Sequence, residues 1–192
     1  MSTQTRQVGV ELLPQYAAIP ISFKVESVFS ITLTDQGLGG FVLREQKVDA
    51  PYIKDYDSHD RVTNWPKRFD VSKWGVFLAL DGARPVGGAT VAIDTPGVDM
   101  LEGRRDLAVL WDIRVHPDER RRGIGSKLFK QAAEWSRQRG CRQLKIETQN
   151  INVPACRFYA KQGCELGAIH RYGYAGHPHV VHEAMLLWYL DL

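Results

Sequence analysis

The stretch VHPDERRRGIG (residues 115–125) joins a run typical of a strand to a run typical of a helix, and it sets the organisation of the chain. Before it, LAVLWDIRV (107–115) is rich in β-branched and aromatic residues and predicts a strand. After Gly123, apolar residues recur at helical spacing, and Gly140 stands where a left-handed residue commonly ends a helix. Gly123 and Gly125 permit positive φ and close approach of a ligand to the backbone. The helix start would direct N–H groups at that ligand, which favours a phosphate.

The segments around this junction predict further strands and helices packed on one sheet. The expected elements are a strand at 21–32, a loop or short helix at 55–73, a hairpin at 75–93 turning at Asp81-Gly82, a connection at 94–106, a strand at 141–148, a helix from about Pro154 to Gln162, and closing strands in 164–174 and 182–190. This order predicts an α/β or α+β sandwich. Because no repeat or linker divides the chain, we expect a single domain over residues 1–192.

Length and composition exclude several classes of protein. The chain has 192 residues, of which 44% are hydrophobic and 24% charged, close to the globular average and unlike disordered, collagen-like or coiled-coil chains. No apolar run reaches the roughly 18 residues of a membrane helix, and the first 20 residues lack the apolar core of a secretory signal. Three cysteines without a CxxC pair predict reduced thiols. We therefore expect a cytoplasmic protein without membrane contact.

Charge is unevenly distributed although the net charge is only +3. Residues 114–142 carry nine lysines and arginines against three acids. Residues 45–60 carry the opposite excess, with Glu45, Asp49, Asp55, Asp57 and Asp60 against two lysines. This asymmetry suggests two ligands of opposite charge, and the alternative is a pair of solvated faces.

Other patterns point away from several kinds of site. The glycine-rich run matches neither the dinucleotide GxGxxG motif nor a Walker loop. Four histidines between His170 and His182 have no recognised zinc spacing, so no metal is expected. Cys156 has no histidine paired with it locally and is expected to be packing rather than a nucleophile. The tryptophans are not interleaved with basic residues, which argues against nucleic-acid binding.

Two motifs in register resemble the GNAT superfamily of N-acetyltransferases. RRRGIG (120–125) is similar to the superfamily's Arg/Gln-x-x-Gly-x-Gly/Ala acetyl-CoA loop. The pattern N-x-x-A-x-x-F-Y-x-x-x-G follows 27 residues after Gly125, at Asn152, Ala155, Phe158, Tyr159 and Gly163. Within the superfamily, the chain resembles the streptothricin acetyltransferase group in 146–169, in APYIKDY (50–56), in Asp112-Ile113 and in the C-terminal HEAMLLWYLDL. The resemblance covers about residues 40–192 and is weak over the first 40.

The resemblance implies an α+β fold whose mixed, mostly antiparallel sheet has two splayed central strands, flanked by helices, with acetyl-CoA in the gap. The backbone from Ile113 to Val115 would pair with the pantetheine arm, and Lys161 would lie near the nucleotide. The implied cofactor residues are Ile113, Arg114, Val115, Arg120, Arg121, Arg122, Gly123, Ile124, Gly125, Ser126, Asn152, Ala155, Tyr159 and Lys161.

Amine acetylation needs a base and an acid. Freeing an amine of pKa near 10.4 at pH 7 costs about 4 kcal/mol, and the leaving thiolate gains from protonation. Tyr159 matches the acid position of the family, and the alternative is an aromatic packed beside Phe158. Glu147 matches the base, and the alternative is an exposed strand carboxylate. Asp112 is a competing base or, with Asp55 and Glu147, a group that binds a cationic acceptor.

The sequence thus predicts an acetyl-CoA-dependent N-acetyltransferase, without a metal, that acts by direct transfer in a ternary complex on a primary amine of a small cationic molecule such as a streptothricin-like antibiotic. The mixed charge of SHDRVTNWPKR (58–68) departs from that group, which is more acidic there, and weakens streptothricin itself as the substrate. The alternatives are a protein N-terminal or lysine acetyltransferase and a non-catalytic acetyl-CoA-binding domain. The protein is expected to be a monomer or homodimer.

Overall fold

The computed structural model describes residues 3–58 and 60–192. These residues form two compact units. Unit 1 comprises the chain up to Ser22, Asp55–Ile146 and Tyr189–Leu192, and unit 2 comprises Phe23–Lys54 and Glu147–Trp188. That the chain is a single domain stays a prediction.

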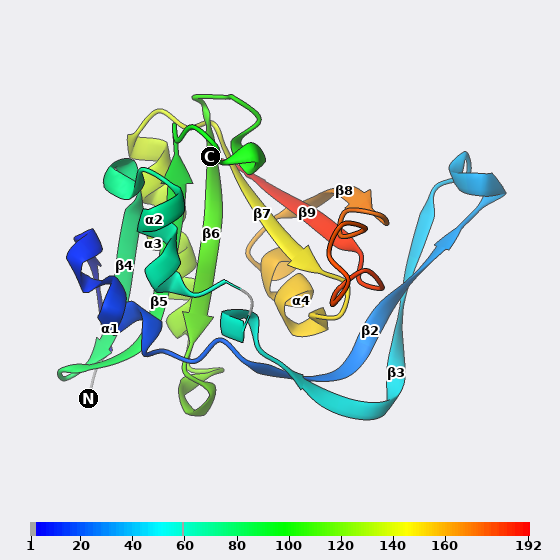
Figure 1. The fold of residues 1–192 in the computed structure, drawn as a ribbon, viewed down its shortest axis with the longest axis horizontal. Helices are drawn as coiled ribbons and strands as arrows, with labels where there is room; N and C mark the ends of the chain where they lie inside the picture. The colour runs from blue at the N-terminus through cyan, green and yellow to red at the C-terminus, as the bar shows by residue number, and fades with distance from the viewer. Residues whose placement is uncertain (1–2, 59) are drawn as a thin grey trace. The chain divides into compact units, whose positions relative to one another are not determined.

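A seven-stranded sheet has the strand order β1-β4-β5-β6-β7-β9-β8 (Figure 1). Its strands are β1 (Gln4–Val8), β4 (Gly75–Asp81), β5 (Arg84–Ile93), β6 (Leu107–Val115), β7 (Gln143–Gln149), β8 (Glu165–His170) and β9 (Met185–Asp191). The pairs β1–β4, β4–β5 and β5–β6 are antiparallel, whereas β6–β7 is parallel. The helices are α1 (Leu13–Ala17), α2 (Trp65–Arg68), α3 (Ile124–Gln138) and α4 (Val153–Lys161). The predicted α+β class with a mixed, mostly antiparallel sheet is confirmed.

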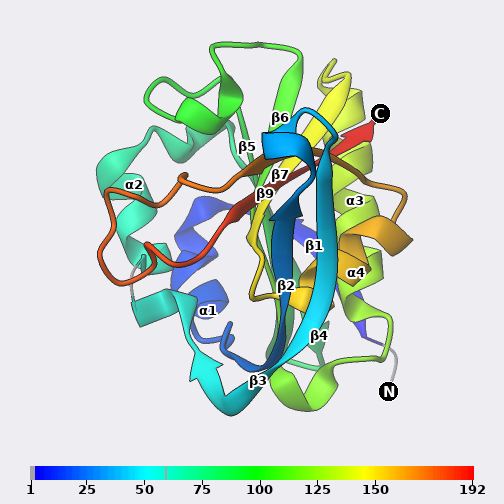
Figure 2. The same ribbon diagram turned by 90° about the vertical axis from the view of Figure 1, so that its right-hand side faces the viewer.

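In unit 1 the helices cover both faces of the sheet. Helices α1 and α2 lie on one face of β4–β6 and α3 lies on the other (Figures 1 and 2). Two adjacent glycines of β5 permit this close packing. A Cβ on Gly87 would lie 2.9 Å from the Ile124 side chain of α3, and one on Gly88 would lie 2.4 Å from the Tyr16 ring of α1. Because successive strand residues point to opposite faces, each glycine admits a different helix.

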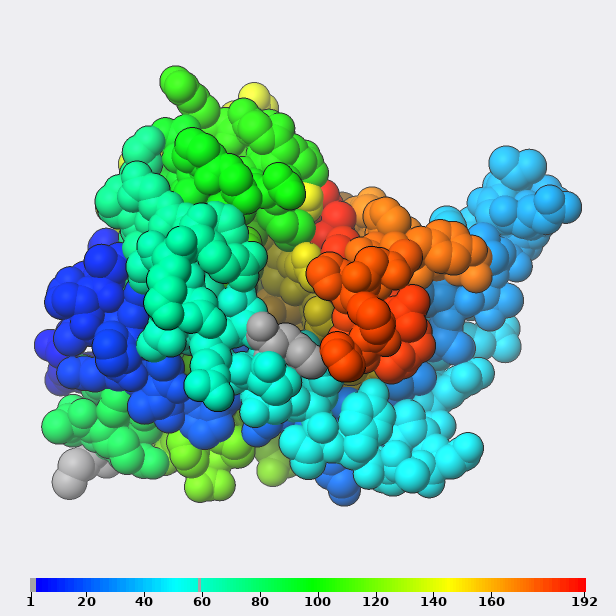
Figure 3. All heavy atoms as spheres, in the orientation of Figure 1, coloured from blue at the N-terminus to red at the C-terminus, as the bar shows by residue number. Residues whose placement is uncertain are grey.

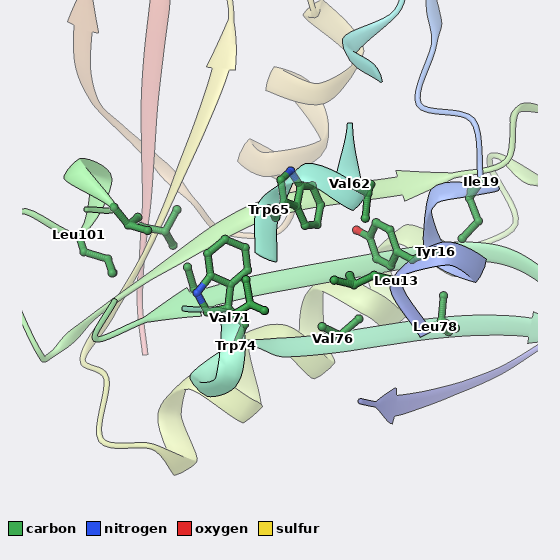
Figure 4. Close-up of a cluster of buried hydrophobic side chains, with 13 residues drawn as sticks. Leu13, Tyr16, Ile19, Val62, Trp65, Val71, Trp74, Val76, Leu78 and Leu101 are labelled. Atoms are coloured by element: carbon green, nitrogen blue, oxygen red, sulfur yellow. The ribbon is translucent and has the colours of Figure 1, made fainter. Parts of the chain in front are cut away.

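The core under α1 and α2 combines aliphatic side chains with the aromatic rings of Tyr16, Trp65 and Trp74 (Figure 4). The ring centroids of Trp65 and Trp74 lie 6.1 Å apart, and those of Trp74 and Trp111 lie 5.3 Å apart. Trp111 is the extra residue of a β-bulge, because β5 pairs with Leu110 and then with Asp112. In Figure 3 the segments that carry α1 (blue) and α2 (teal) form part of the visible face of unit 1, and the green segment between β5 and β6 forms its upper part.

Unit 2 contains a long hairpin of β2 (Phe23–Leu33) and β3 (Phe41–Lys54). Asn150, just after β7, holds the hairpin by bonding to both backbone polar groups of Phe29. The Phe29 N–H donates to the Asn150 carbonyl at 2.9 Å, and the Asn150 side-chain amide donates to the Phe29 carbonyl at 2.9 Å. The unit also contains the end of β7, helix α4, strand β8, the loop that follows it, and β9 as far as Trp188.

Most expected elements are present, two expectations need correction, and three elements are present that the sequence did not predict. The strand at 107–115, the 75–93 hairpin, α3 and α4 are confirmed. Strand β3 was not expected, and neither were β1 and α1. The closing strand ends at His170, so residues 171–174 form turns rather than strand. Gly125 lies in the first turn of α3 without positive φ, whereas Arg121 has a φ of 63°. No helix of the described residues is long and apolar enough to cross a membrane.

Candidate active site

Strand β6 pairs with β5 over a longer stretch than it pairs with β7. In the described residues, the register between β6 and β7 runs only from Leu107–Gln143 to Leu110–Ile146. The register with β5 continues along β6 as far as Val115. The register with β7 ends at Leu110, whereas the register with β5 continues through Ile113 and Val115. This is the segment expected to bind the pantetheine arm.

The loop after β6 turns into α3 with the geometry that an anion needs. Gly123 begins the helix with a φ of 81°, a left-handed value that a side chain would strain. The Lys127 N–H donates to the Gly123 carbonyl at 3.1 Å and makes the first bond of the helical ladder. The N–H groups of Ile124, Gly125 and Ser126 precede that bond, at the positive end of a 15-residue helix. This arrangement favours a pyrophosphate.

The three arginines of this loop are not equivalent. Arg120 donates to the carbonyls of Val115 at 3.1 Å and Ser22 at 2.7 Å, and burial lowers its pKa. Arg122 forms an ion pair with Glu119. Arg121 is exposed. Arg120 therefore holds the loop to Val115 and Ser22, whereas Arg121 and Arg122 are exposed.

Asp112 and Arg114 form the centre of a buried ionic network in unit 1. Asp112 accepts from the Tyr16 hydroxyl at 2.5 Å and from Arg114 Nε and Nη2 at 2.9 and 2.8 Å. Arg114 also donates to both oxygens of Asp57, at 2.9 and 3.1 Å, and to the Ile19 carbonyl at 3.0 Å. The Arg114 side chain is 1% exposed. These contacts give the Arg114 side chain a structural role that its expected place in cofactor binding did not include.

Charge and burial act together on the pKa values in this network. Burial raises the pKa of Tyr16 well above its ordinary value, and the Asp112 carboxylate raises it further. Burial alone would lower the pKa of Arg114, but the charge and hydrogen bonds of Asp112 outweigh that effect and raise it. Tyr16 and Arg114 therefore stay protonated, and both of them donate to Asp112.

The acidic segment is already engaged by neighbouring groups. Asp57 is bound to Arg114, and Asp60 pairs with Arg68 at 3.0 Å. Asp55 accepts from the Asp57 N–H at 3.1 Å in a turn. In unit 2, Glu45 pairs with Arg157 and accepts from Ser27 Oγ at 2.6 Å. Counting acids along the sequence therefore overstates the negative charge available to a cationic acceptor, because the count omits their partners.

Glu147 of β7 accepts a hydrogen bond from a residue that the sequence did not single out. The Tyr174 hydroxyl donates to Glu147 Oε1 at 2.6 Å and accepts from Gln149 Nε2 at 2.9 Å. Tyr174 is buried. Glu147 and Gln149 share one face of β7 because they are two residues apart. Alternation along β7 predicts that shared face, but nothing in the sequence indicates that Tyr174 reaches it.

Helix α4 presents the second motif. Asn152 is its N-cap, and the side-chain oxygen of Asn152 accepts from the Ala155 N–H at 3.2 Å. Tyr159 is buried, with ring centroids 5.4 Å from Phe158 and 6.5 Å from Trp188. Lys161 is exposed at the last position of the helix. Capping α4 is therefore one reason why the motif has an asparagine at position 152.

The cysteines are free and buried. Burial raises the pKa of Cys156 to about 12 and that of Cys164 to about 11. Within residues 3–58 and 60–192, no group of three or more His, Cys, Asp or Glu side chains is arranged to hold a metal ion.

The chain matches the acetyltransferase (GNAT) family over residues 42–164. It is 31% identical over 184 residues to streptothricin acetyltransferase of Escherichia coli, and the match covers 94% of each chain. The chain belongs to the GNAT family of acetyltransferases, and it is an N-acetyltransferase. It is also 27% identical to streptothricin acetyltransferase A of Bacillus subtilis, over 79% of this chain and 80% of that one. The predicted resemblance is confirmed.

Two solved structures share the fold over the whole chain. Nourseothricin acetyltransferase superimposes with a TM-score of 0.77 and 26% identity, covering 100% of this chain and 99% of that one. A Bacillus anthracis protein, solved in complex with acetyl coenzyme A, superimposes with a TM-score of 0.78 and 24% identity, covering 100% of both chains. The predicted GNAT fold is therefore confirmed.

Proposed function

We propose that this enzyme transfers the acetyl group of acetyl-CoA to a primary amine of a small cationic acceptor of the streptothricin class. The observation that carries the proposal is the 31% identity to an enzyme named for streptothricin, along 94% of both chains. The match to the acetyltransferase family ends at residue 164. The match to the Escherichia coli enzyme covers 94% of the chain, so it also includes residues after 164. Acceptor preference differs among members of one family, and a likeness that extends past the shared region supports a shared acceptor class.

Acetyl-CoA is proposed to bind through backbone groups. The β6 backbone from Ile113 to Val115 would pair with the pantetheine amides, and the N–H groups of Ile124 to Ser126 would hold the pyrophosphate. Arg121, exposed at the loop, would meet the phosphates. Lys161, also exposed, is proposed for the nucleotide end.

Glu147 and Tyr159 are proposed as the base and the acid. Glu147 takes a proton from the acceptor ammonium, directly or through a water, and the free nitrogen attacks the thioester carbonyl carbon. When the tetrahedral intermediate collapses, its nitrogen gives its second proton to water, the carbon–sulfur bond breaks and Tyr159 gives its proton to the CoA sulfur. The products are the N-acetylated acceptor and CoA, and the two side chains exchange protons with solvent to restore their starting states. Asp112 is the weaker candidate base because Arg114 holds both of its oxygens.

A CoA-release assay across amine acceptors tests this function. Streptothricin is compared with polyamines, lysine and a peptide with a free N-terminus. We expect streptothricin to give the highest kcat/KM, and a preference for the peptide or for neutral amines would contradict the proposal. Acetyl-CoA binding, expected at about −8 kcal/mol (a low-micromolar Kd), is measured by calorimetry. Gly123→Glu should abolish it, because the side chain strains a left-handed position and adds negative charge where the pyrophosphate would bind.

A further inference from the structure

The loop between β8 and β9 (residues 171–184) bonds to the strand that carries the proposed base. Its Tyr174 places one hydroxyl between two side chains of β7. Gln149 donates to the hydroxyl oxygen at 2.9 Å, and the hydroxyl donates to Glu147 Oε1 at 2.6 Å. All three bonded groups lie in unit 2. The hydrogen bonds therefore run in one direction, from the amide through the hydroxyl to the carboxylate, and each polarises the next.

The far end of this loop is also fixed. Lys54 Nζ pairs with Glu183 Oε1 at 2.6 Å, with side chains 11% and 2% exposed. The next residue, Ala184, donates its N–H to the Asn150 side-chain oxygen at 2.8 Å. A buried ion pair and a backbone bond hold the end of the loop, so Tyr174 is presented by a segment anchored on both sides. A donor held in this way can fix the orientation of the carboxylate it contacts.

We propose that Tyr174 is a positioning residue that orients Glu147 for proton abstraction, an inference that rests on the proposed role of Glu147 as the base. The Tyr174 hydroxyl holds Oε1, so Oε2 is the atom that takes the proton from the acceptor ammonium. Tyr174 keeps its own proton throughout and touches neither acceptor nor cofactor. It holds the carboxylate in the orientation that the reaction needs.

Tyr174→Phe tests this role, because it keeps the ring and removes only the donor. We expect kcat to fall between about 10-fold and 10²-fold, the cost of a misplaced catalytic group, with the KM for acetyl-CoA unchanged. The matched control is Tyr172→Phe, the same change two residues away on a side chain that is 70% exposed. That control should keep the kcat of the parent enzyme. Thermal unfolding of each variant establishes that it is folded.

A double-mutant cycle with Glu147→Gln separates positioning from packing. If Tyr174 acts through Glu147, Tyr174→Phe lowers kcat in the parent enzyme but not in the Glu147→Gln background. An equal loss in both backgrounds overturns the inference, as does an unchanged kcat in Tyr174→Phe when Glu147→Gln is impaired. If Glu147→Gln itself keeps full turnover, the assignment of the base is wrong and the inference falls with it.

A second variant keeps the test decisive if Tyr174→Phe does not fold. Gln149→Met keeps the side-chain length and removes the donor to the Tyr174 oxygen while leaving the hydroxyl in place. It should lower kcat by a smaller factor than the loss expected for Tyr174→Phe. That loss should also vanish in the Glu147→Gln background, and a loss that persists there overturns the inference.

Discussion

Asp112 in unit 1 and Glu147 in unit 2 are both carboxylates that accept a hydrogen bond from a buried tyrosine, yet they suit different tasks. Tyr16 donates to Asp112 at 2.5 Å, and Tyr174 donates to Glu147 at 2.6 Å. Asp112 also receives two bonds from the guanidinium of Arg114. The difference between the two sites is thus a buried cation.

That cation decides what protonation would cost. If Asp112 were protonated, the buried positive charge of Arg114 would lose one of its two negatively charged partners. A buried charge without a partner of opposite charge is strongly destabilising. A proton on Glu147 would leave a neutral pair of carboxyl and phenol, which can still share a hydrogen bond. We therefore expect Asp112, which is bonded to a buried cation, to serve the fold, and Glu147, which is bonded to a neutral donor, to serve the reaction.

The largest effect that tests this difference is on turnover. Glu147→Gln should lower kcat by about 10²–10⁴-fold, the usual contribution of a general base, with little change in the free energy of unfolding. Asp112→Asn, the same carboxylate-to-amide change, should lower the free energy of unfolding and cost much less turnover per folded molecule. CoA release and urea denaturation measure the two quantities. A larger loss of kcat in Asp112→Asn than in Glu147→Gln would reverse the assignment of the base.

The next effect is on stability. Arg114→Met should lower the free energy of unfolding by about 3–5 kcal/mol, because it removes the cation between two carboxylates. Arg68→Met is the matched control. It breaks the pair with Asp60, whose side chains are 52% and 37% exposed, and should cost at most about 1 kcal/mol. Urea unfolding curves measure both variants, and equal losses would show that the buried network adds nothing to the fold.

The parts of the fold that the sequence predicted are those with many buried apolar residues. Strand β6 begins with four consecutive buried apolar residues, and helix α3 buries apolar residues at helical spacing, so both patterns are clear in the sequence. Strand β3 is largely exposed along its length, and its mixed charged sequence shows no alternation. Strand β1 is short and polar, and its place comes from pairing with β4. Such strands are defined by their partners rather than by their own sequence.

The same limit applies to the site. The glycine loop and the α4 motif are local patterns, and the sequence contained all of their residues. The ionic and tyrosine partners lie far along the chain: Tyr16 is 96 positions from Asp112, Asp57 is 57 positions from Arg114, and Tyr174 is 27 from Glu147. A sequence gives the charges of such residues but not their pairing. For that reason the acidic segment looked like a ligand surface.

A third tyrosine sharpens the comparison. If Tyr159 is the acid, Tyr159→Phe should lower kcat by about 10²-fold while the affinity for acetyl-CoA survives, because only a proton donor is lost. Calorimetry measures the affinity for acetyl-CoA, and steady-state kinetics with the preferred acceptor measure kcat. Unchanged turnover would make Tyr159 a packing residue between Phe158 and Trp188.

The smallest effect is expected at Cys156, the buried thiol of α4, whose environment opposes ionisation. Burial raises the pKa of Cys156 to about 12, so at pH 8 only about one thiol in 10⁴ is the reactive thiolate. We expect Cys156→Ala to keep kcat within about twofold, the scatter expected of a residue outside the chemistry. Iodoacetamide at pH 8 should leave the folded enzyme active and should label the thiol once urea has unfolded the chain. Mass spectrometry after incubation with acetyl-CoA alone tests the opposite possibility, that Cys156 is acetylated. An acetyl group on Cys156, together with lost turnover in a folded Cys156→Ala variant, would establish a covalent route and remove the case for direct transfer to the amine.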